Sequence, residues 1–553
     1  MTEVLLIQPP LSDFYLTAGR TSPYGLAVLA GALRREGYKV EIVDALATNR
    51  RAAIPPPPEV AAAAALYGPP DRSPFGLFSG FFRFGESPAE VAGRAARSGA
   101  RLVGISSLFT AYAGEALEVA RAVRERMPGA TIVLGGHHAT ALPGEVLSCP
   151  AVDFVLRGEA EESLPRLARA LFGGTAPEGI PGLCRRGPGG APVIAPPAVV
   201  EPSRIPAPAR DLLPPPAGRG RGRAVVAAGR GCPLRCSYCC VNAGAGVPWR
   251  LRPVAQVLDE IETAVQAHEA RFIDFEDENL ALDRRWFRRL LAGLRARLGG
   301  RGIELRAMNG LFPPSLDAAL VADMAAAGFR TLNLALATTD AAQLARFRRP
   351  DVAAAFDCAL DAADAAGLTA VGYLLAGAPG QDPEASLDDL LWLAPRRVLA
   401  AVSVFYPAPG SADWALCRDR GLLPASWGAL RATALPIAEA TTRLQAVTLL
   451  RLARLLNFAK RLCDVGVGLP AARVRDAEAL PGDDRTAAGL RLLSWFFAEA
   501  RLYGLSPSGA VWEHPIDRGL ARRFRDGLLA RGVRGVASTA PPAFPAPGGR
   551  FST

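Results

Sequence analysis

Short apolar runs alternate with helix-like segments through the first 170 residues of the chain. The runs suited to strands are 3–8, 40–44, 102–106, 131–134 and 152–156. Segments with the apolar spacing of amphipathic helices are 25–36, 113–127 and 162–171. This alternation predicts an α/β fold with a doubly wound, Rossmann-like parallel sheet, which binds ligands at the carboxyl ends of its strands.

A second series of strand-like runs begins after residue 222. These runs are 223–229, 272–275, 303–307, 331–336, 369–375 and 398–405, with helical segments between them. Six such units predict a partial, TIM-like (β/α)6 barrel, whose active face is again the carboxyl end of the strands. From 422 onward the chain is rich in Leu, Ala and Arg with helical periodicity, which predicts a helical domain.

Composition divides the chain further, because 553 residues are too many for a single hydrophobic core. Proline and glycine are concentrated between the two series of strands, which is typical of an extended linker. The expected parts are a Rossmann-like domain at 1–185, a linker at 186–222, the barrel at 223–421, the helical domain at 422–540 and a disordered tail at 541–553. Phenylalanines in an insertion at 54–85 are expected to pack this long loop rather than cover a ligand.

The net charge of +10 raises the possibility of a nucleic-acid partner. Lysine occurs only at Lys39 and Lys460, however, and the arginines are spread out, whereas a nucleic-acid surface concentrates basic and aromatic residues in one stripe. We therefore expect no such partner. The first residues lack a basic leader, and no apolar stretch reaches the ~18 residues of a membrane span, so we expect a cytoplasmic protein.

Cys232, Cys236 and Cys239 form a CxxxCxxC triplet directly after the first strand of the barrel. Three thiolates in one loop can hold three irons of a [4Fe-4S] cluster and leave the fourth iron open for a ligand. Structural zinc is the alternative, but it usually takes a fourth ligand from a second pair of cysteines or histidines, and no such pair occurs. A disulfide is the weakest reading, because nothing indicates secretion.

With its aromatic residue at Tyr238, the triplet resembles the CxxxCxφC signature of the radical S-adenosylmethionine (SAM) superfamily. In that family the open iron chelates SAM, and reductive cleavage gives a 5′-deoxyadenosyl radical. The stretch 377–381 resembles the GxPGQ motif that packs against adenine, and 274–278 resembles an acidic FxDDxF motif. The resemblance implies SAM contacts at Tyr238, Glu276, Asp277, Thr338, Gly377 and Pro379.

The chain departs from that family after the fourth barrel strand, where many relatives carry a Glu-Ser pair that contacts SAM. Residues 335–339 contain no carboxylate. We therefore expect hydroxyl contacts through Thr338 or Thr339, or contacts supplied from elsewhere in the fold.

The stretches 135–140 and 152–161 resemble the GGxHxT and VDFVxRGExE strings of cobalamin-binding domains found upstream of many radical SAM proteins. The combined resemblance covers residues 1 to about 420. It implies cobalamin contacts at Pro9, Ser106, Ser107, Thr110, Gly135, Gly136, His137, Thr140, Gly158 and Glu159. The DxHxxG motif of classical B12 enzymes is absent, so we expect a loop histidine to hydrogen-bond the corrin or the sheet rather than to ligate cobalt.

The resemblance implies a cobalamin-dependent radical SAM enzyme that acts on an unactivated carbon, with methyl transfer as the commoner outcome. Its expected partners are a small-molecule or peptide substrate and a low-potential electron donor, flavodoxin or ferredoxin. Rearrangement or cyclisation without methyl transfer is an alternative, and a non-catalytic cobalamin or iron–sulfur sensor is another. An RNA methylthiotransferase would need further N-terminal cysteines, but none precedes Cys149.

Overall fold

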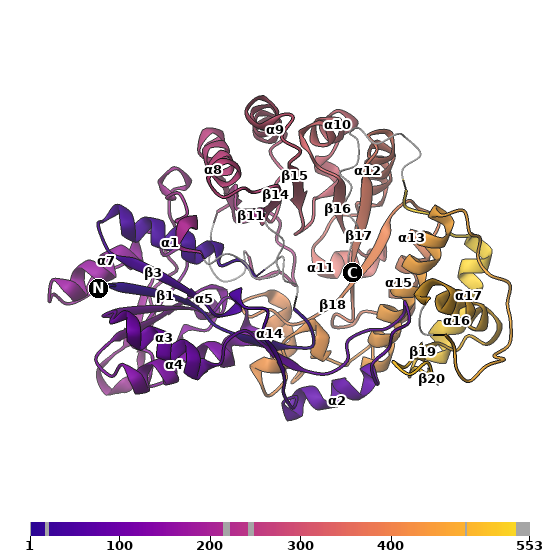
Figure 1. Cartoon of the computed structure of the whole chain (residues 1–553), viewed down its shortest axis with the longest axis horizontal. Helices are drawn as coiled ribbons and strands as arrows, with labels where there is room; N and C mark the ends of the chain where they lie inside the picture. Colours follow the sequence, from indigo (N-terminus) through magenta and orange to yellow (C-terminus); the bar gives the residue numbers. More distant parts are fainter. Residues whose placement is uncertain (1, 17–20, 214–221, 242–247, 482–483, 538–553) are drawn as a thin grey trace.

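The computed structural model describes residues 2–16, 21–213, 222–241, 248–481 and 484–537. Its first part is built on a seven-stranded sheet in the order β10-β9-β8-β7-β6-β1-β3 (Figure 1). The strands are β1 (Val4–Gln8), β3 (Val40–Asp44), β6 (Leu102–Ser106), β7 (Thr131–Gly135), β8 (Phe154–Leu156), β9 (Leu183–Arg186) and β10 (Pro192–Val193).

Helices cover both faces of this sheet, as the sequence pattern predicts. The helices α1 (Tyr24–Arg35) and α7 (Ser163–Phe172) share one buried cluster with it. On the opposite face lie α3 (Pro88–Ser98), α4 (Ala113–Arg126) and α6 (Pro143–Leu147). The doubly wound α/β fold class is therefore confirmed.

One edge of the sheet differs from the all-parallel expectation. The five strands β3, β1, β6, β7 and β8 are parallel to one another. In contrast, β9 runs antiparallel to β8, and β10 runs antiparallel to β9. An edge strand can be antiparallel because it does not need to continue the series of crossover helices. The strand β10 also lies within the stretch that the composition assigns to the linker.

Six parallel strands form the second part, in two runs of three. They are β11 (Arg223–Val226), β14 (Phe272–Phe275), β15 (Glu304–Ala307), β16 (Thr331–Ala337), β17 (Thr369–Ala376) and β18 (Leu399–Val404). Isolated bridges from Leu305 to Phe329 and from Leu311 to Leu334 join the two runs. Around the outside lie α8 (Val254–Ala267), α9 (Arg284–Leu298), α10 (Ala318–Ala327), α12 (Ala353–Ala365) and α13 (Pro383–Leu393) (Figure 1).

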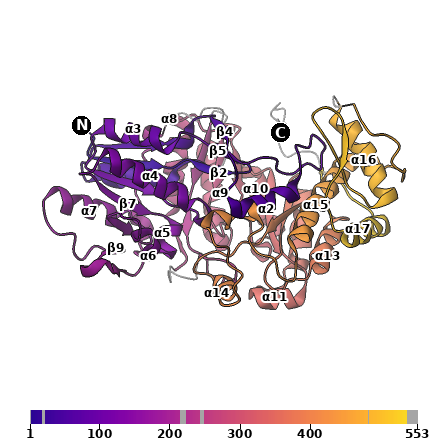
Figure 2. The same cartoon turned by 90° about the horizontal axis from the view of Figure 1, so that it is seen from below.

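The C-terminal part consists of the helices α15 (Arg443–Asp464), α16 (Arg485–Glu499) and α17 (Arg518–Arg531) with a hairpin of β19 (Tyr503–Leu505) and β20 (Val511–Glu513). Their buried residues belong to the same hydrophobic cluster as the barrel. The insertion contributes α2 (Pro58–Tyr67), which packs along α15 (Figure 2). Phe75 in this insertion is fully buried against Phe458, with ring centroids 5.6 Å apart.

Two expectations concern residues outside those described, namely the tail at 541–553 and the prolines at 214–216 of the linker. Across the described ranges, no helix combines the length and apolar character needed to cross a membrane.

Candidate functional site

The cysteine loop, residues 231–249, leaves the barrel at the carboxyl end of β11 and closes on a short antiparallel ladder. In this ladder β12 (Gly229–Arg230) pairs with β13 (Arg250–Leu251), and Arg230 lies opposite Arg250. Gly231 follows the ladder with φ of 76°, a left-handed conformation that glycine adopts without strain. The residues that flank the loop on both sides are therefore joined by this ladder.

The middle of the loop is held by two later segments of the barrel. The amide of Ser237 donates to the carbonyl of Phe347 over 3.0 Å. The Ser237 carbonyl accepts from the amide of Asp413 at 2.9 Å, and its hydroxyl donates to the Asp413 carboxylate at 3.1 Å. The ring of Tyr238 packs edge-on against Phe347 at 4.9 Å. Residues between the cysteines thus hold the loop in place and leave the thiols to other contacts.

Two of the three thiols accept hydrogen bonds from side chains outside the loop. Asn279 donates to Cys232 Sγ at 2.9 Å, and Arg349 donates to Cys236 Sγ at 3.7 Å. Burial raises the pKa of the Cys239 thiol to about 12 and that of Cys232 above its ordinary value, so a positive partner is needed to hold them as thiolates. An iron cluster supplies such charge, and this donor set fits it.

Within the described residues, no group of three or more His, Cys, Asp or Glu side chains is placed to hold one metal ion.

The two acidic candidates after β14 have different surroundings. The Asp277 carboxylate is buried and accepts from the amide of Ala228 at 2.9 Å, and burial raises its pKa to about 7. Asp277 therefore supports the chain just before the cysteine loop. Glu276 is only half-buried and accepts from the Asn309 amide group at 3.3 Å. Of the two, Glu276 has the more accessible carboxylate.

A carboxylate does reach the end of β16, although residues 335–339 contain none. Asp389 extends from α13, and its Oδ1 accepts from both the amide and the hydroxyl of Thr339 at 2.6 Å. Thr338 is buried, and its hydroxyl accepts from the amide of Asp340 at 3.1 Å. The Thr338 hydroxyl therefore already has a role in starting the next helix, α11 (Ala341–Phe347).

The loop after β17 is fixed by its own glutamine. Gln381 donates to the carbonyl of Leu375 at 2.7 Å and accepts from the amide of Ala378 at 3.0 Å. Gly377 has φ of 76°, and Pro379 is buried beside it. The backbone of this loop is thus held in one conformation at the active face of the barrel.

The expected cobalamin residues gather at the carboxyl end of the first sheet. Gly136 has φ of 113°, and a Cβ there would lie 2.5 Å from the carbonyl oxygen of Ser107. Thr140 accepts from the amide of Gly158 at 2.9 Å, which joins the loops after β7 and β8. The hydroxyl of Ser107 is buried and has no partner among the described residues. A ligand group could satisfy that hydroxyl, so these loops fit a bound corrinoid.

The two histidines of this region have separate roles. His138 is buried, and its Nδ1 lies 3.2 Å from the hydroxyl of Thr110, so it serves the loop itself. His137 is exposed, yet its pKa is lowered by loss of hydration and by Arg230. His137 therefore lies near Arg230, at the foot of the cysteine loop. Pro9 is buried after β1, and Ser106 ends β6.

Glu159 joins this sheet to the barrel. Its carboxylate forms ion pairs with Arg250 at 2.5 Å and Arg230 at 3.7 Å, and it also accepts from the amide of Val200 at 2.6 Å. Glu161 pairs with Arg230 at 2.5 Å. The Glu159 carboxylate is therefore already paired with the two arginines that flank the cysteine loop. We refer to Glu159, Glu161, Arg230 and Arg250 as the interdomain clasp.

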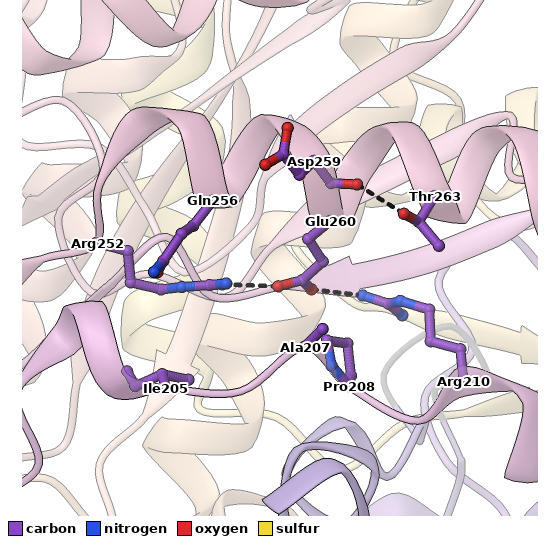
Figure 3. A pocket seen from close by; sticks show the side chains of 9 residues that line it. All are labelled: Ile205, Ala207, Pro208, Arg210, Arg252, Gln256, Asp259, Glu260 and Thr263. Carbon is purple, nitrogen blue, oxygen red and sulfur yellow. Dashed lines mark hydrogen bonds and ion pairs between the residues drawn. The ribbon is translucent and has the colours of Figure 1, made fainter. Parts of the chain in front are cut away.

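A separate cavity of about 240 Å³ lies between α8 and the segment 205–210 (Figure 3). Glu260 bridges two arginines in it, Arg210 and Arg252, with both contacts at 2.7 Å. Arg252 also donates to the carbonyl of Ala227 at 2.9 Å, and Tyr24 of α1 donates to Glu260 at 3.4 Å. The contacts around this cavity therefore join α1 and the segment 205–210 to the barrel.

Sequence reasoning missed several residues that this site uses, namely Asn279, Arg349, Asp389, Arg230 and Arg250. The first three reach the site from other elements of the barrel, and the two arginines lie at the foot of the cysteine loop. Only the position of Asn279, in the acidic stretch after β14, gave a signal that could have found it.

Family comparisons agree with this geometry. The B12 binding domain family matches residues 83–168, and the Radical SAM superfamily matches residues 226–393. By these matches the chain contains a B12 binding domain and a radical SAM domain. The first match spans β6 to β8 and the second runs from the end of β11 through β17, so the resemblance seen in the motifs is confirmed.

Two curated relatives are methyltransferases by name. The chain is 28% identical to an uncharacterized methyltransferase of Pyrococcus horikoshii, over 51% of this chain and 55% of the relative. It is 24% identical to cytidylyl-2-hydroxyethylphosphonate methyltransferase of Streptomyces wedmorensis, again over 51% of this chain and 55% of the relative. The chain thus spans about half the length of these curated relatives.

A solved structure shares the fold. The radical SAM methyltransferase TsrM from Kitasatospora setae, with cobalamin and a [4Fe-4S] cluster bound, superposes with a TM-score of 0.56 at 20% identity. The match covers 76% of this chain and 75% of TsrM. The arrangement of a B12 binding sheet beside a radical SAM barrel is therefore shared beyond the two family matches.

Proposed function

We propose that this chain is a cobalamin-dependent radical SAM methyltransferase that methylates an unactivated carbon of a small-molecule or peptide substrate. The observation that carries the proposal is the interdomain clasp, because Glu159 of the corrinoid loop pairs directly with Arg230 and Arg250 at the foot of the cysteine loop. The methyltransferase names of the relatives support the same reaction.

In this proposal Cys232, Cys236 and Cys239 hold three irons of a [4Fe-4S] cluster, and SAM binds the fourth. When bound, these groups and cobalamin supply one-electron cleavage of SAM and a transferable methyl group. The proposed SAM contacts are Tyr238, Glu276, Asp277, Thr338, Gly377 and Pro379. The side chains of two of them bind backbone amides and so shape the site indirectly. Asp277 binds the amide of Ala228 before the cysteine loop, and Thr338 binds the amide of Asp340 at the start of α11.

The proposed cobalamin contacts are loop residues at the carboxyl end of the first sheet. Some would let the ligand approach the backbone closely, and others would offer it hydrogen-bonding groups. They are Pro9, Ser106, Ser107, Thr110, Gly135, Gly136, His137, Thr140, Gly158 and Glu159. Ser107 has a buried hydroxyl without a partner among the described residues, and the side chain of His137 is exposed. Glu159 contributes by holding its loop against the barrel.

The protein's own part in this reaction is positioning and exclusion of water. The Gln381 contacts keep the 377–381 loop rigid, and the Ser237 contacts keep the cysteine loop closed on the barrel. Holding reactants in a fixed geometry removes much of the entropic barrier of a bimolecular step. A low-potential donor, flavodoxin or ferredoxin, is the proposed source of the electron.

The test is anaerobic turnover of the reconstituted protein with SAM, cobalamin, dithionite and a candidate substrate. We expect both 5′-deoxyadenosine and S-adenosylhomocysteine, with a methylated product of matching mass. The C232A variant should lose the cluster and both products. Formation of 5′-deoxyadenosine alone would indicate rearrangement, and no SAM cleavage by a protein with an intact cluster would indicate a sensor.

A further inference from the structure

Arg349 joins the cysteine loop to the end of the fourth barrel strand. Its Nη1 donates to the hydroxyl of Tyr238 at 3.1 Å and to Cys236 Sγ at 3.7 Å. Its Nη2 donates to the carbonyl of Ala335 in β16 at 3.0 Å. The turn that places it begins at Arg348, which has φ of 54° and ends α11. The guanidinium is therefore held in one orientation against the loop.

Within the described part of the chain, the Arg349 guanidinium contacts a thiol, a phenol and a backbone carbonyl but forms no ion pair with a carboxylate. A partly buried guanidinium stays charged, so it needs a negative group nearby. The groups beside it are the Cys236 thiol and the Tyr238 phenol. A cysteine thiolate bound to a cluster is the anion that this position would serve.

A second donor approaches the triplet from the segment after β14, the strand that pairs with β11. Asn279 follows β14, is buried, and donates to Cys232 Sγ at 2.9 Å. Two of the three candidate cluster ligands thus receive a side-chain N–H from outside the loop, one of them from a cation. Hydrogen bonds and positive charge at ligand sulfurs are among the factors that set the potential of an iron–sulfur cluster.

We propose that Arg349 and Asn279 are positioning residues that raise the reduction potential of the cluster through Cys236 and Cys232. The inference rests on the cluster of the proposed function, but not on methyl transfer. Reduction adds one electron from the low-potential donor to the cluster and breaks no bond. Because the reduced cluster is more negative, N–H donors and a cation stabilise it more than the oxidised one.

The experiment is an anaerobic redox titration of the reconstituted full chain, followed by the EPR signal of the reduced cluster. The R349Q variant removes the charge, R349K keeps the charge and loses the fork of donors, and N279L removes the second donor at similar volume. The matched control is R348Q, which removes the same charge from the exposed neighbouring residue. Iron and sulfide content is measured for every variant.

We expect R349Q to lower the equilibrium constant for reduction about tenfold, which is a shift of about 59 mV for a one-electron couple. R349K should shift it less, N279L should lower it about threefold, and R348Q should match the wild type. Potentials of R349Q and N279L equal to that of R348Q would overturn the proposal. If R349Q assembles no cluster, R349K and N279L carry the same test.

The two proposals fail in different ways. If the reduction potentials of the variants shift as expected but the wild type gives no methylated product, the methyltransferase proposal fails and this inference stands. A wild-type protein that binds no iron at the triplet overturns both.

Discussion

Asp389 shows how a single residue supplies a carboxylate that its local sequence lacks. It lies on α13, 50 residues after Thr339, whose amide and hydroxyl it accepts. One of its oxygens, Oδ2, is buried without a partner among the described residues, and burial raises its pKa to about 6. The carboxylate is therefore retained at a cost in stability, which is common where a fold supports a functional loop.

The D389N variant should change the pH dependence of stability. The pKa of Asp389 rises from 3.8 when unfolded to about 6 when folded, so the folded protein binds the proton more tightly. The free energy of unfolding of the wild type should therefore fall with rising pH across that window, by up to about 3 kcal/mol relative to D389N.

Urea titrations of both proteins at several pH values measure this difference. Above about pH 6 the gap between the two proteins should stay constant. A gap that does not change between pH 4 and pH 6 would contradict the raised pKa.

Gly136 allows the loop after β7 to lie close to the loop after β6, which contains Ser107. Its φ of 113° is unfavourable for other residues, and a Cβ would lie 2.5 Å from a backbone oxygen of Ser107. We expect G136A to displace the Ser107 loop and to weaken cobalamin binding at least about tenfold, which is a loss of about 1.4 kcal/mol.

Cobalamin binding followed by its absorbance tests this prediction. The matched control is G114A in α4, where a Cβ would meet no atom within 4 Å. It should bind cobalamin like the wild type. If G136A and G114A bind cobalamin equally well, this loop does not contribute to cobalamin binding.

At the scale of elements, the β12–β13 ladder and the loop after β8 form one unit. The ladder has only two residue pairs, Gly229 with Leu251 and Arg230 with Arg250, and it is too short to be stable by itself. Glu159 and Glu161 hold both of its arginines from the neighbouring sheet. The position of the cysteine loop is therefore determined by the corrinoid domain as well as by the barrel.

The E159Q variant should loosen this unit without unfolding either sheet. Removing one partner of buried charge pairs leaves the arginines poorly compensated, and it costs about 3–5 kcal/mol. Hydrogen exchange should show faster exchange of the amides of Gly229, Arg230 and Leu251.

The control is E162Q, because Glu162 pairs with Arg204 at 3.0 Å on the surface. Surface pairs contribute ~1 kcal/mol or less, so exchange in the ladder should not change in this variant. Equal protection of the ladder in E159Q and the wild type would contradict the clasp.

At the scale of the whole molecule, the C-terminal helices share a hydrophobic core with the barrel. Buried residues of α15, α16 and α17 belong to the same cluster as the barrel strands. Lys460 of α15 is fully buried and donates to the carbonyls of Leu393 and Ala394 at 2.9 and 2.8 Å. Arg431 reaches back to the first part, where it donates to the carbonyl of Ala111 at 2.8 Å.

A chain ending at residue 421 should therefore fail to fold its barrel, because it exposes the apolar side of β18 and α13. We expect aggregation, or a circular dichroism spectrum without a cooperative thermal transition. A chain ending at residue 540 keeps every described residue and should unfold like the full chain. A cooperative transition in the shorter chain would show that the barrel is independent of α15 to α17.

The local pattern of the sequence was sufficient for most elements. The boundaries expected for β3, β6 and β14 match the structure residue for residue, because each is a compact apolar run between polar turns. The antiparallel edge of β9 and β10 was not foreseen, since strand direction depends on where the chain re-enters the sheet. The segment after residue 422 is largely helical, as expected, but its helices share the hydrophobic core of the barrel.

By itself, the sequence determined the order of strands and helices, the cysteine triplet and the two glycine-rich loops, because these depend on residues close together along the chain. The tertiary structure decided which side chains surround them. Asp389 reaches Thr339, Arg349 reaches Cys236, and Glu159 reaches Arg250, across separations of 50, 113 and 91 residues. Such contacts leave no periodic signal, since they depend on how separate elements pack rather than on the spacing within one of them.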